Sequence, residues 1–391
     1  MGYDELFTPV RIGKKEIKNR IAFAPTGMGT ADRFGGVTDQ VLCHYVARAK
    51  GGSGLVFVEH TMSNYKFGLE GSGALGFHRD RNLAGMYDLA NAIQAFDAVA
   101  VVQLSIGLGR EMGVGPSPIA PRYDAGSMPK ALKHFEGQNL PVPRELTVEE
   151  IEELENLYVA SVLRTKVAGF DGIEIHGAHG YLLASFLSPH ANQRTDQYGG
   201  SFDKRLTLAL NLLRKSREAA GDDFIIGFRI SGDEHIPGGL TLADCRNIAR
   251  ILEDEGIDYI HLSCGTLESK KYLCPDKEGV IFPEAAAIKE AVRIPVICPN
   301  FHTPELAANA VREGKVDVVS LCRGLLADPQ WPIKVKEGRI DDIQKCLLCN
   351  SCLKHLFEGF HTRCVVNPDV GRERFMPEYF PPARKRRGAR H

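Results

Sequence analysis

Eight short apolar runs, separated by helical stretches, constrain the fold of this 391-residue chain more than any other feature. The runs are continuous and rich in β-branched residues, which is typical of strands covered on both faces. They span residues 21–24, 54–59, 98–105, 172–176, 224–230, 258–263, 294–299 and 316–321. Helical patterns separate most of them, at 148–168, 202–220, 242–255, 283–292 and 304–312. Thr147 and Glu150 form a predicted capping box at the start of the first of these helices.

Eight strands joined by helical crossovers predict an α/β fold, specifically a (β/α)8 TIM barrel. An open, doubly wound sheet is the alternative, and it normally carries a glycine fingerprint at its first strand–helix turn. The one candidate for that fingerprint, residues 107–113, has the wrong glycine spacing and no well-placed acidic residue. The sequence therefore favours the barrel.

Functional residues of a barrel lie just beyond the C-terminal ends of its strands. Polar and titratable side chains occupy these positions after several of the predicted strands, which is the composition of a cofactor pocket rather than of a core. The candidates are Pro25, Thr26, Gly27, Glu59, His60, Gln103, His176, His179, Tyr181, Arg229, Cys264, Asn300, Cys322 and Arg323.

Four cysteines near the C-terminus indicate a metal centre. Cys346, Cys349 and Cys352 follow one another in two CxxC steps, and eleven residues separate Cys352 from Cys364. Such a set of thiolates suits an iron–sulfur cluster or zinc. Structural zinc sites more often use two separated CxxC pairs, so the spacing favours a cluster, with zinc as the rival. Buried or disulfide-bonded cysteines are the least favoured interpretation.

Composition sets the compartment and excludes some partners. The six other cysteines are scattered through apolar or helical segments and are interpreted as free buried thiols. Free thiols beside a thiolate site predict a reducing, cytoplasmic location. The formal charge is −1, there is no signal peptide pattern, and no stretch has the roughly 20 apolar residues that span a bilayer. We expect neither nucleic acid nor membrane as a partner, while a homo-oligomer stays possible.

The segment from His176-Gly-Ala-His179-Gly-Tyr181 to Tyr-Gly-Gly-Ser-Phe-Asp-Lys-Arg205 resembles the signature of the Old Yellow Enzyme superfamily of flavin-dependent oxidoreductases. Leu6-Phe-Thr-Pro and Lys18-Asn-Arg-Ile resemble its opening, and 321–329 resembles its phosphate-side turn. The 346–364 segment is similar to the 4Fe–4S segment of the branch with 2,4-dienoyl-CoA reductase and trimethylamine dehydrogenase. The resemblance covers nearly the whole chain up to about Pro368.

The resemblance implies FMN across the barrel mouth, with NAD(P)H a possible electron donor. The Pro25–Thr26–Gly27 turn is expected along the flavin, Gln103 at its pyrimidine edge and Arg229 near N1 and O2. Arg323 and the backbone around Asn300 are expected at the phosphate, and the strand-end residues Glu59 and Cys322 are counted with the cofactor site. His176 and His179 are expected to donate hydrogen bonds to a substrate oxygen, with Tyr181 as proton donor.

Some positions depart from the family pattern. Gly27 stands where trimethylamine dehydrogenase has the cysteine that holds its flavin, so a noncovalent flavin is expected. The single tryptophan, Trp331, speaks against a tryptophan cage for an amine. Cluster-containing relatives usually continue into a second flavin and nicotinamide domain, whereas this sequence ends in a basic tail. We therefore expect a separate redox partner protein. The predicted units are a barrel at 1–340, a cluster segment at 341–370 and a tail at 371–391.

Three functional hypotheses remain at this stage. The first is an enzyme that reduces the C=C bond of an α,β-unsaturated carbonyl or enoyl thioester. The second is an amine dehydrogenase or N-demethylase that passes electrons through the cluster to a partner. The third is an electron-transfer or scaffold subunit without substrate chemistry. The set Gln103, His176, His179, Tyr181 and Arg229 argues against the third. The Pro- and Gly-rich insertion at 110–145 is expected to shape the substrate pocket.

Overall fold

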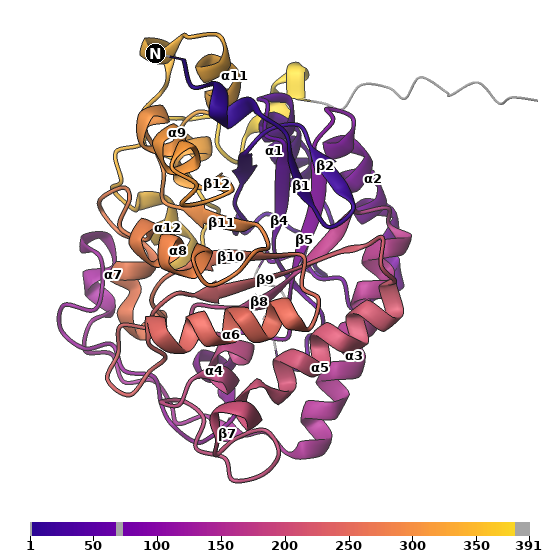
Figure 1. Ribbon diagram of the computed structural model, residues 1–391, viewed down its shortest axis with the longest axis vertical. Helices are drawn as coiled ribbons and strands as arrows, with labels where there is room; N and C mark the ends of the chain where they lie inside the picture. The colour runs from indigo at the N-terminus through magenta and orange to yellow at the C-terminus, as the bar shows by residue number, and fades with distance from the viewer. Residues whose placement is uncertain (1, 68–72, 380–391) are drawn as a thin grey trace, which may run out of the picture.

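The computed structural model describes residues 2–67 and 73–379, and its centre is a closed barrel of eight parallel strands (Figure 1). The strands pair in chain order, and the last pairs with the first. They are β3 (Ile21–Phe23), β4 (Leu55–Met62), β5 (Val99–Ser105), β8 (Gly172–Gly177), β9 (Ile225–Ser231), β10 (Tyr259–Ser263), β11 (Val296–Pro299) and β12 (Val318–Leu321). All eight predicted runs therefore form the barrel, and the TIM-barrel prediction is confirmed.

Helices surround the barrel, including one at each of the five predicted segments. They are α1 (Asp39–Lys50), α2 (Leu83–Gln94), α3 (Val148–Val167), α5 (Phe202–Ala220), α6 (Leu242–Asp254), α8 (Phe282–Lys289), α9 (Pro304–Arg312), α10 (Arg323–Ala327) and α11 (Trp331–Lys336). The predicted capping box is present: the Glu150 backbone N–H donates to the Thr147 hydroxyl, and the Glu150 carboxylate accepts from the Thr147 backbone N–H. These bonds satisfy two of the backbone donors left free at a helix start.

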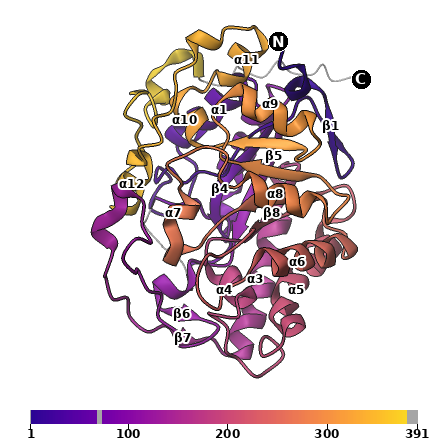
Figure 2. The same cartoon turned by 60° about the vertical axis from the view of Figure 1, so that its left-hand side comes forward.

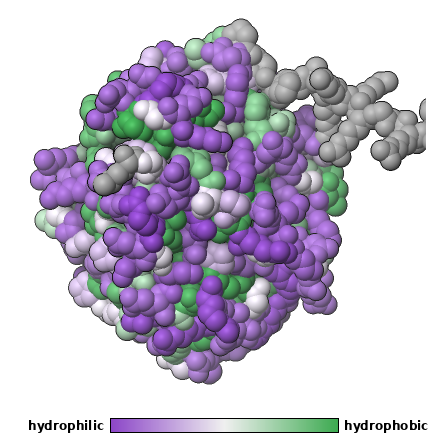
Figure 3. All heavy atoms as spheres, turned by 45° about the horizontal axis from the view of Figure 1, so that its top comes forward, coloured by the Kyte–Doolittle hydropathy of each residue, from purple (hydrophilic) through white to green (hydrophobic). Residues whose placement is uncertain are grey.

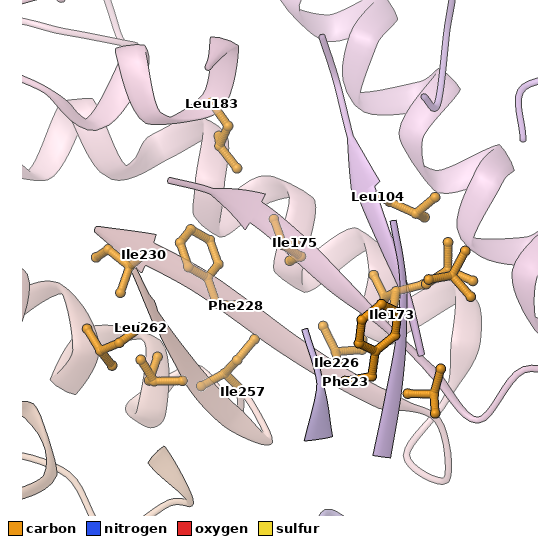
Figure 4. Close-up of a cluster of buried hydrophobic side chains, with 14 of the residues drawn as sticks. Phe23, Leu104, Ile173, Ile175, Leu183, Ile226, Phe228, Ile230, Ile257 and Leu262 are labelled. Atoms are coloured by element: carbon orange, nitrogen blue, oxygen red, sulfur yellow. The ribbon is translucent and has the colours of Figure 1, made fainter. Parts of the chain in front are cut away.

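Two apolar cores hold the barrel. The larger lies between the strands and the helices and includes Phe23, Ile173, Ile226 and Phe228 (Figure 4). The smaller fills the barrel interior. The hairpin of β1 (Val10–Ile12) and β2 (Lys15–Ile17) adds its apolar residues to this inner core. The opposite, C-terminal end of the strands is therefore the end left for a ligand.

Strand β4 carries a bulge where two residues face one on the neighbouring strand. Val58 pairs with Val102 and Thr61 with Leu104, so Glu59 and His60 together oppose the single residue Gln103. A bulge interrupts the alternation of side chains and turns them in new directions. The strand is also longer than predicted. The predicted run ends at residue 59, whereas β4 continues past the bulge to Met62.

The segment after α11 packs back onto the barrel. Its helix α12 (Ser351–Phe357) lies beside the short 3-10 helix at Lys130–Phe135 and near α7 (Lys270–Leu273), as Figure 2 shows. The following residues also belong to the folded body. Glu373 is buried and pairs with Arg48 and His44 of α1, so 371–379 does not form a free tail. The basic run at 384–390 lies outside the described residues.

Within the described ranges, no helix is long and apolar enough to cross a membrane. The face of the molecule in Figure 3 is mostly polar, with apolar side chains in small scattered groups.

Candidate active site

A cavity of about 230 Å³ lies at the C-terminal end of the barrel. Every barrel strand contributes a residue on the strand or directly after it. These residues are Ala24, His60, Gln103, His176, Arg229, Ser263, Pro299 and Cys322. Such a position is where barrel enzymes bind their ligands. The convergence that the sequence predicted is therefore present in three dimensions.

Most of the predicted site residues line this one cavity. They are Pro25, Thr26, Gly27, Gln103, His176, His179, Tyr181, Arg229, Asn300, Cys322 and Arg323. Cys264 is one exception, and Glu59 is the other. Glu59 is 1% exposed and its Oε2 accepts a hydrogen bond from the Met28 backbone N–H at 2.9 Å. The β4 bulge turns Glu59 toward the 25–28 turn and leaves His60 in the cavity wall. Glu59 therefore positions the turn and does not itself line the cavity.

Four aromatic side chains form one face of the cavity. The Tyr181 and His60 rings lie parallel, with centroids 5.3 Å apart, and the His176 ring meets the Tyr181 ring edge-on at 5.1 Å. His179 lies next to His176, at 4.9 Å between ring centroids. Burial, together with Glu111 and Cys274, raises the pKa of Tyr181 above its usual range. The phenol therefore keeps its proton at neutral pH and is available as a proton donor.

The two histidines are neutral donors in this setting. Burial is the main cause that holds the pKa of His176 and of His179 well below the usual value, and Arg229 adds to it. The Ala178 backbone N–H donates to Nδ1 of His176 at 3.4 Å, which leaves the proton of the neutral ring on Nε2. His179 Nε2 and the Ser263 hydroxyl share a 2.6 Å hydrogen bond. Both rings thus have a fixed orientation at the cavity wall.

Arg229 is a buried cation with unused hydrogen-bonding capacity. Its Nε and one terminal nitrogen are buried without a partner among the described residues. Below it, Glu174 accepts hydrogen bonds from Gln103 Nε2 at 2.7 Å and from His261 at 2.8 Å. Burial alone would raise the Glu174 pKa, but His261, Arg229 and Gln103 together hold it below the usual range. The Gln103 amide is thereby oriented, with its oxygen left for a ligand.

A second group of unpaired donors lies near the ends of β11 and β12. Asn300 has a positive φ of 72°, which asparagine tolerates, and its Nδ2 is buried without a partner. Nδ1 of His302 is likewise unpartnered. Arg323 donates to the Pro275 carbonyl and to Asn350 Oδ1 through one nitrogen and also lines the cavity. Buried donors without partners are rare in native proteins, so both groups fit a ligand that brings acceptors.

The four C-terminal cysteines meet at a smaller pocket. Cys346, Cys349, Cys352 and Cys364 all line it, together with Arg323 and Leu326. All four are free thiols. Burial raises the pKa of the Cys346 and Cys352 thiols, whereas the adjacent Arg323 acts to lower both. The set is therefore spatially compact, as the spacing predicts.

The cysteine pocket and the main cavity share a wall. Arg323, Leu326 and Cys352 line both. The segment also docks on the 25–29 turn, because the Thr362 hydroxyl donates to the Gly27 carbonyl and the Thr362 backbone N–H donates to the Met28 carbonyl. A Cβ added to Gly27 would lie 3.2 Å from Leu356. Gly27 therefore permits the close approach of α12, a packing reason that the sequence did not reveal.

His60, a strand-end candidate to which the sequence analysis gave no role, lines the cavity as well. Ser263 was not a candidate, and its place at the end of a strand was the one signal available. Leu353, Leu356 and Phe357 of α12 line the cavity as well, although the sequence placed them only in the cysteine segment.

The insertion at 110–145 forms an outer layer behind the cavity wall. The short strands β6 (Val114–Gly115) and β7 (Arg144–Glu145) pair at its base. Its Tyr123, Met128 and Leu132 pack with Leu267 against Tyr181 and Phe357. The Lys270 ammonium lies over the rings of Tyr123 and Phe357, at 4.6 and 4.5 Å from their centroids. The insertion thus shapes the cavity through Tyr181 and α12 and does not line it directly.

Comparisons with known proteins agree with this geometry. The model of the NADH:flavin oxidoreductase / NADH oxidase family matches residues 5–342. A relative described as NADH oxidase, from Thermoanaerobacter brockii, is 40% identical over 380 residues, which are 95% of this chain and 57% of the relative. The chain therefore spans little more than half the length of that relative.

Two solved structures resemble the whole chain. A 2-naphthoyl-CoA reductase in complex with 2-naphthoyl-CoA has a TM-score of 0.85 and 31% identity. The match covers 95% of this chain and 58% of the reductase chain. A histamine dehydrogenase from Rhizobium sp. 4-9 has a TM-score of 0.83 and 30% identity. The match covers 95% of this chain and 53% of the dehydrogenase chain.

Proposed function

The chain belongs to the NADH:flavin oxidoreductase / NADH oxidase family of enzymes, and from this premise we propose that it is an FMN- and 4Fe–4S-dependent reductase. Its proposed substrate is the C=C bond of an α,β-unsaturated carbonyl compound or thioester. The observation that carries the proposal is the placement of a protonated phenol, Tyr181, beside two neutral histidines in one cavity.

The unpaired donors of the cavity fit FMN at both of its ends. Arg229 and the Gln103 amide offer a cation and an acceptor for the polar edge of the isoalloxazine ring. Asn300, His302 and Arg323 offer donors for the phosphate. When bound, FMN supplies the hydride equivalent for the reduction. Arg229 also stabilises negative charge at its side of the cavity, since a buried cation acts strongly in a low dielectric.

The remaining chemistry belongs to the side chains. Nε2–H of His176 donates to the carbonyl oxygen of the substrate, and His179 assists when Ser263 donates to its Nε2. Negative charge develops on that oxygen as the β-carbon is reduced, and fixed donors stabilise it. Tyr181 transfers its proton to the α-carbon, which completes the addition of two hydrogens across the double bond. Solvent restores the phenol proton.

The four cysteines are proposed to hold a 4Fe–4S cluster. Three of them come from two successive CxxC steps and the fourth from a separate turn, a spacing that favours a cluster over a zinc site of two CxxC pairs. The cluster's position beside the cavity suits single-electron exchange between a separate redox partner protein and the flavin.

Amine oxidation is the second candidate, because the histamine dehydrogenase has the same architecture by its TM-score. Trp331, the single tryptophan, is buried, donates to the His302 carbonyl at 3.1 Å and does not line the cavity. The cavity therefore offers no tryptophan cage for a cationic amine. The His176, His179 and Tyr181 arrangement instead suits an oxygen that gains negative charge. A scaffold without chemistry is disfavoured by the same three residues.

Anaerobic purification followed by turnover assays tests the proposal. The protein should contain flavin and about four iron atoms per chain, as one 4Fe–4S cluster requires. With a reduced dye as donor, enones or enoyl thioesters should be reduced, while methylamines should not reduce an oxidised dye. Acid precipitation should release the flavin, because Gly27 offers no sulfur for attachment. Rapid dye reduction by amines, without enone turnover, would replace the first function with the second.

A further inference from the structure

A second cluster of metal-ligating side chains lies outside the cavity. His235 comes from the loop after β9, Cys264 directly follows β10, and Glu284 lies in the first turn of α8. None of the three lines the main cavity. Three separate elements of the barrel thus bring a nitrogen, a sulfur and an oxygen donor together.

The spacing of the donor atoms matches a single coordination sphere. His235 Nε2 lies 3.1 Å from Cys264 Sγ and 3.7 Å from Glu284 Oε1, and Cys264 Sγ lies 3.8 Å from Glu284 Oε1. Tetrahedral zinc, with bonds of about 2.0–2.3 Å to such donors, separates its ligand atoms by roughly 3.3–3.6 Å. The triangle needs shifts of only a few tenths of an ångström to close around an ion.

Glu284 has one carboxylate oxygen that makes no hydrogen bond to any described residue. That oxygen, Oε2, is buried. A buried carboxylate oxygen left unpaired is costly unless a cation or donor reaches it. A metal ion that bound both oxygens of the Glu284 carboxylate, beside Cys264 and His235, would satisfy it.

His235 is oriented in the way that metal-binding histidines usually are. Its Nδ1 faces Asp233 Oδ1 at 3.5 Å, while Nε2 faces Cys264 and Glu284. A carboxylate on the far nitrogen orients the ring and strengthens it as a ligand. The Tyr272 ring stacks on His235 at 3.9 Å between centroids, with 19° between the planes. The ring therefore cannot turn away freely.

We propose that His235, Cys264 and Glu284 form a binding site for a zinc-type divalent cation, with three protein ligands and one open coordination position. The mixed sulfur, nitrogen and oxygen donors suit zinc better than magnesium or calcium, which take oxygen ligands. The His235 side chain is 26% exposed and the Glu284 side chain 16%, so water reaches the fourth position. The ion ties the β9 loop, the end of β10 and α8 together beside the cavity.

Zinc titration of the anaerobically purified holoprotein tests the site. The protein is first freed of loosely bound metal with a mild chelator and then titrated with ZnCl₂ in competition with a fluorescent zinc dye. Iron is measured before and after. We expect one zinc per chain with no loss of iron. Absence of zinc binding, or zinc uptake that matches the loss of iron from the cysteine segment, would overturn the proposal.

Variants locate the ion. Glu284→Gln and Cys264→Ser should each weaken zinc binding at least 100-fold. Asp233→Asn should weaken it 10–100-fold, the usual effect of removing the carboxylate behind a ligating histidine. Glu290→Gln, an exposed carboxylate just after the same helix, is the matched control and should bind as the parent does. Thermal unfolding without zinc checks that each variant is folded. Parent-like affinity in both ligand variants would place the zinc elsewhere and refute the site.

Discussion

The phenol ring of Tyr181 lies parallel to the imidazole of His60, with 5° between the ring planes and 5.3 Å between the centroids. Tyr181 follows β8, whereas His60 sits in the bulge of β4, so two separate strands build this part of the cavity wall. His60 Nε2 is buried without a partner, and burial lowers the pKa of His60 to about 4. A neutral imidazole, and not an imidazolium cation, therefore stacks on the phenol.

Tyr181→Phe should slow substrate reduction about 10²–10⁴-fold, because one positioned proton donor is lost. The flavin content should not change, since the ring and its packing remain. Tyr123→Phe is a matched control, because Tyr123 packs in the same apolar cluster but does not line the cavity. Steady-state and single-turnover rates with the best enone provide the measurement. Equal saturating rates in parent and variant would assign the proton to another donor.

Arg229→Gln should weaken FMN binding by roughly 10–100-fold, the range expected when a buried, charged donor to a ligand is lost. Titration of apoprotein with FMN, followed by flavin fluorescence, measures this directly. Arg250→Gln, on an exposed position of α6, is the control. Unchanged FMN affinity in the Arg229 variant would mean that the orphaned nitrogens serve another ligand.

Glu59→Gln should change the pH dependence of stability. Burial raises the pKa of Glu59 from its usual 4.5 to about 8, so the folded protein keeps this proton after the unfolded chain has lost it. Stability from this group is therefore full below about pH 4.5 and falls, by at most roughly 1.4 kcal/mol per pH unit, as the pH rises toward 8. Glutamine retains an acceptor for the Met28 N–H and has no such loss.

Denaturant unfolding at pH 5, 6, 7 and 8 tests the Glu59 prediction. The stability of the Gln variant relative to the parent should grow over this series. If the difference in unfolding free energy between the Gln variant and the parent stays constant from pH 5 to pH 8, Glu59 is ionised in the folded protein.

Cys349→Ser should remove the iron while the barrel stays folded, because the ligands follow the eighth strand. Ser351→Ala is the control, since it removes the hydroxyl 3.4 Å from Cys349 Sγ and keeps all four thiols. Iron analysis and circular dichroism report the two effects. The rate gain from an added redox partner should also vanish in the Cys349 variant. If that gain persists after the iron is lost, electrons reach the flavin by another route.

Much of the barrel was predictable because its strands are buried on both faces and read as continuous apolar runs. The eight runs, the capped helix α3 and the convergence of His176, Arg229 and Arg323 all follow from local patterns. The bulge did not, because no residue in Leu55–Met62 marks the change of side-chain direction that separates Glu59 from His60. Long-range packing was equally invisible, as the buried Glu373–Arg48 pair shows.

Helix α12 builds part of the cavity wall, although it belongs to the segment that carries the four cysteines. With the proposed cluster in the cysteine pocket, this shared wall implies an order of maturation. The barrel closes from its own strands, but the chamber above it is finished only when the cysteine loop has taken its final shape. A chain without the proposed cluster would thus be a folded protein with an unfinished chamber. Maturation is then better followed by ligand affinity than by the content of secondary structure.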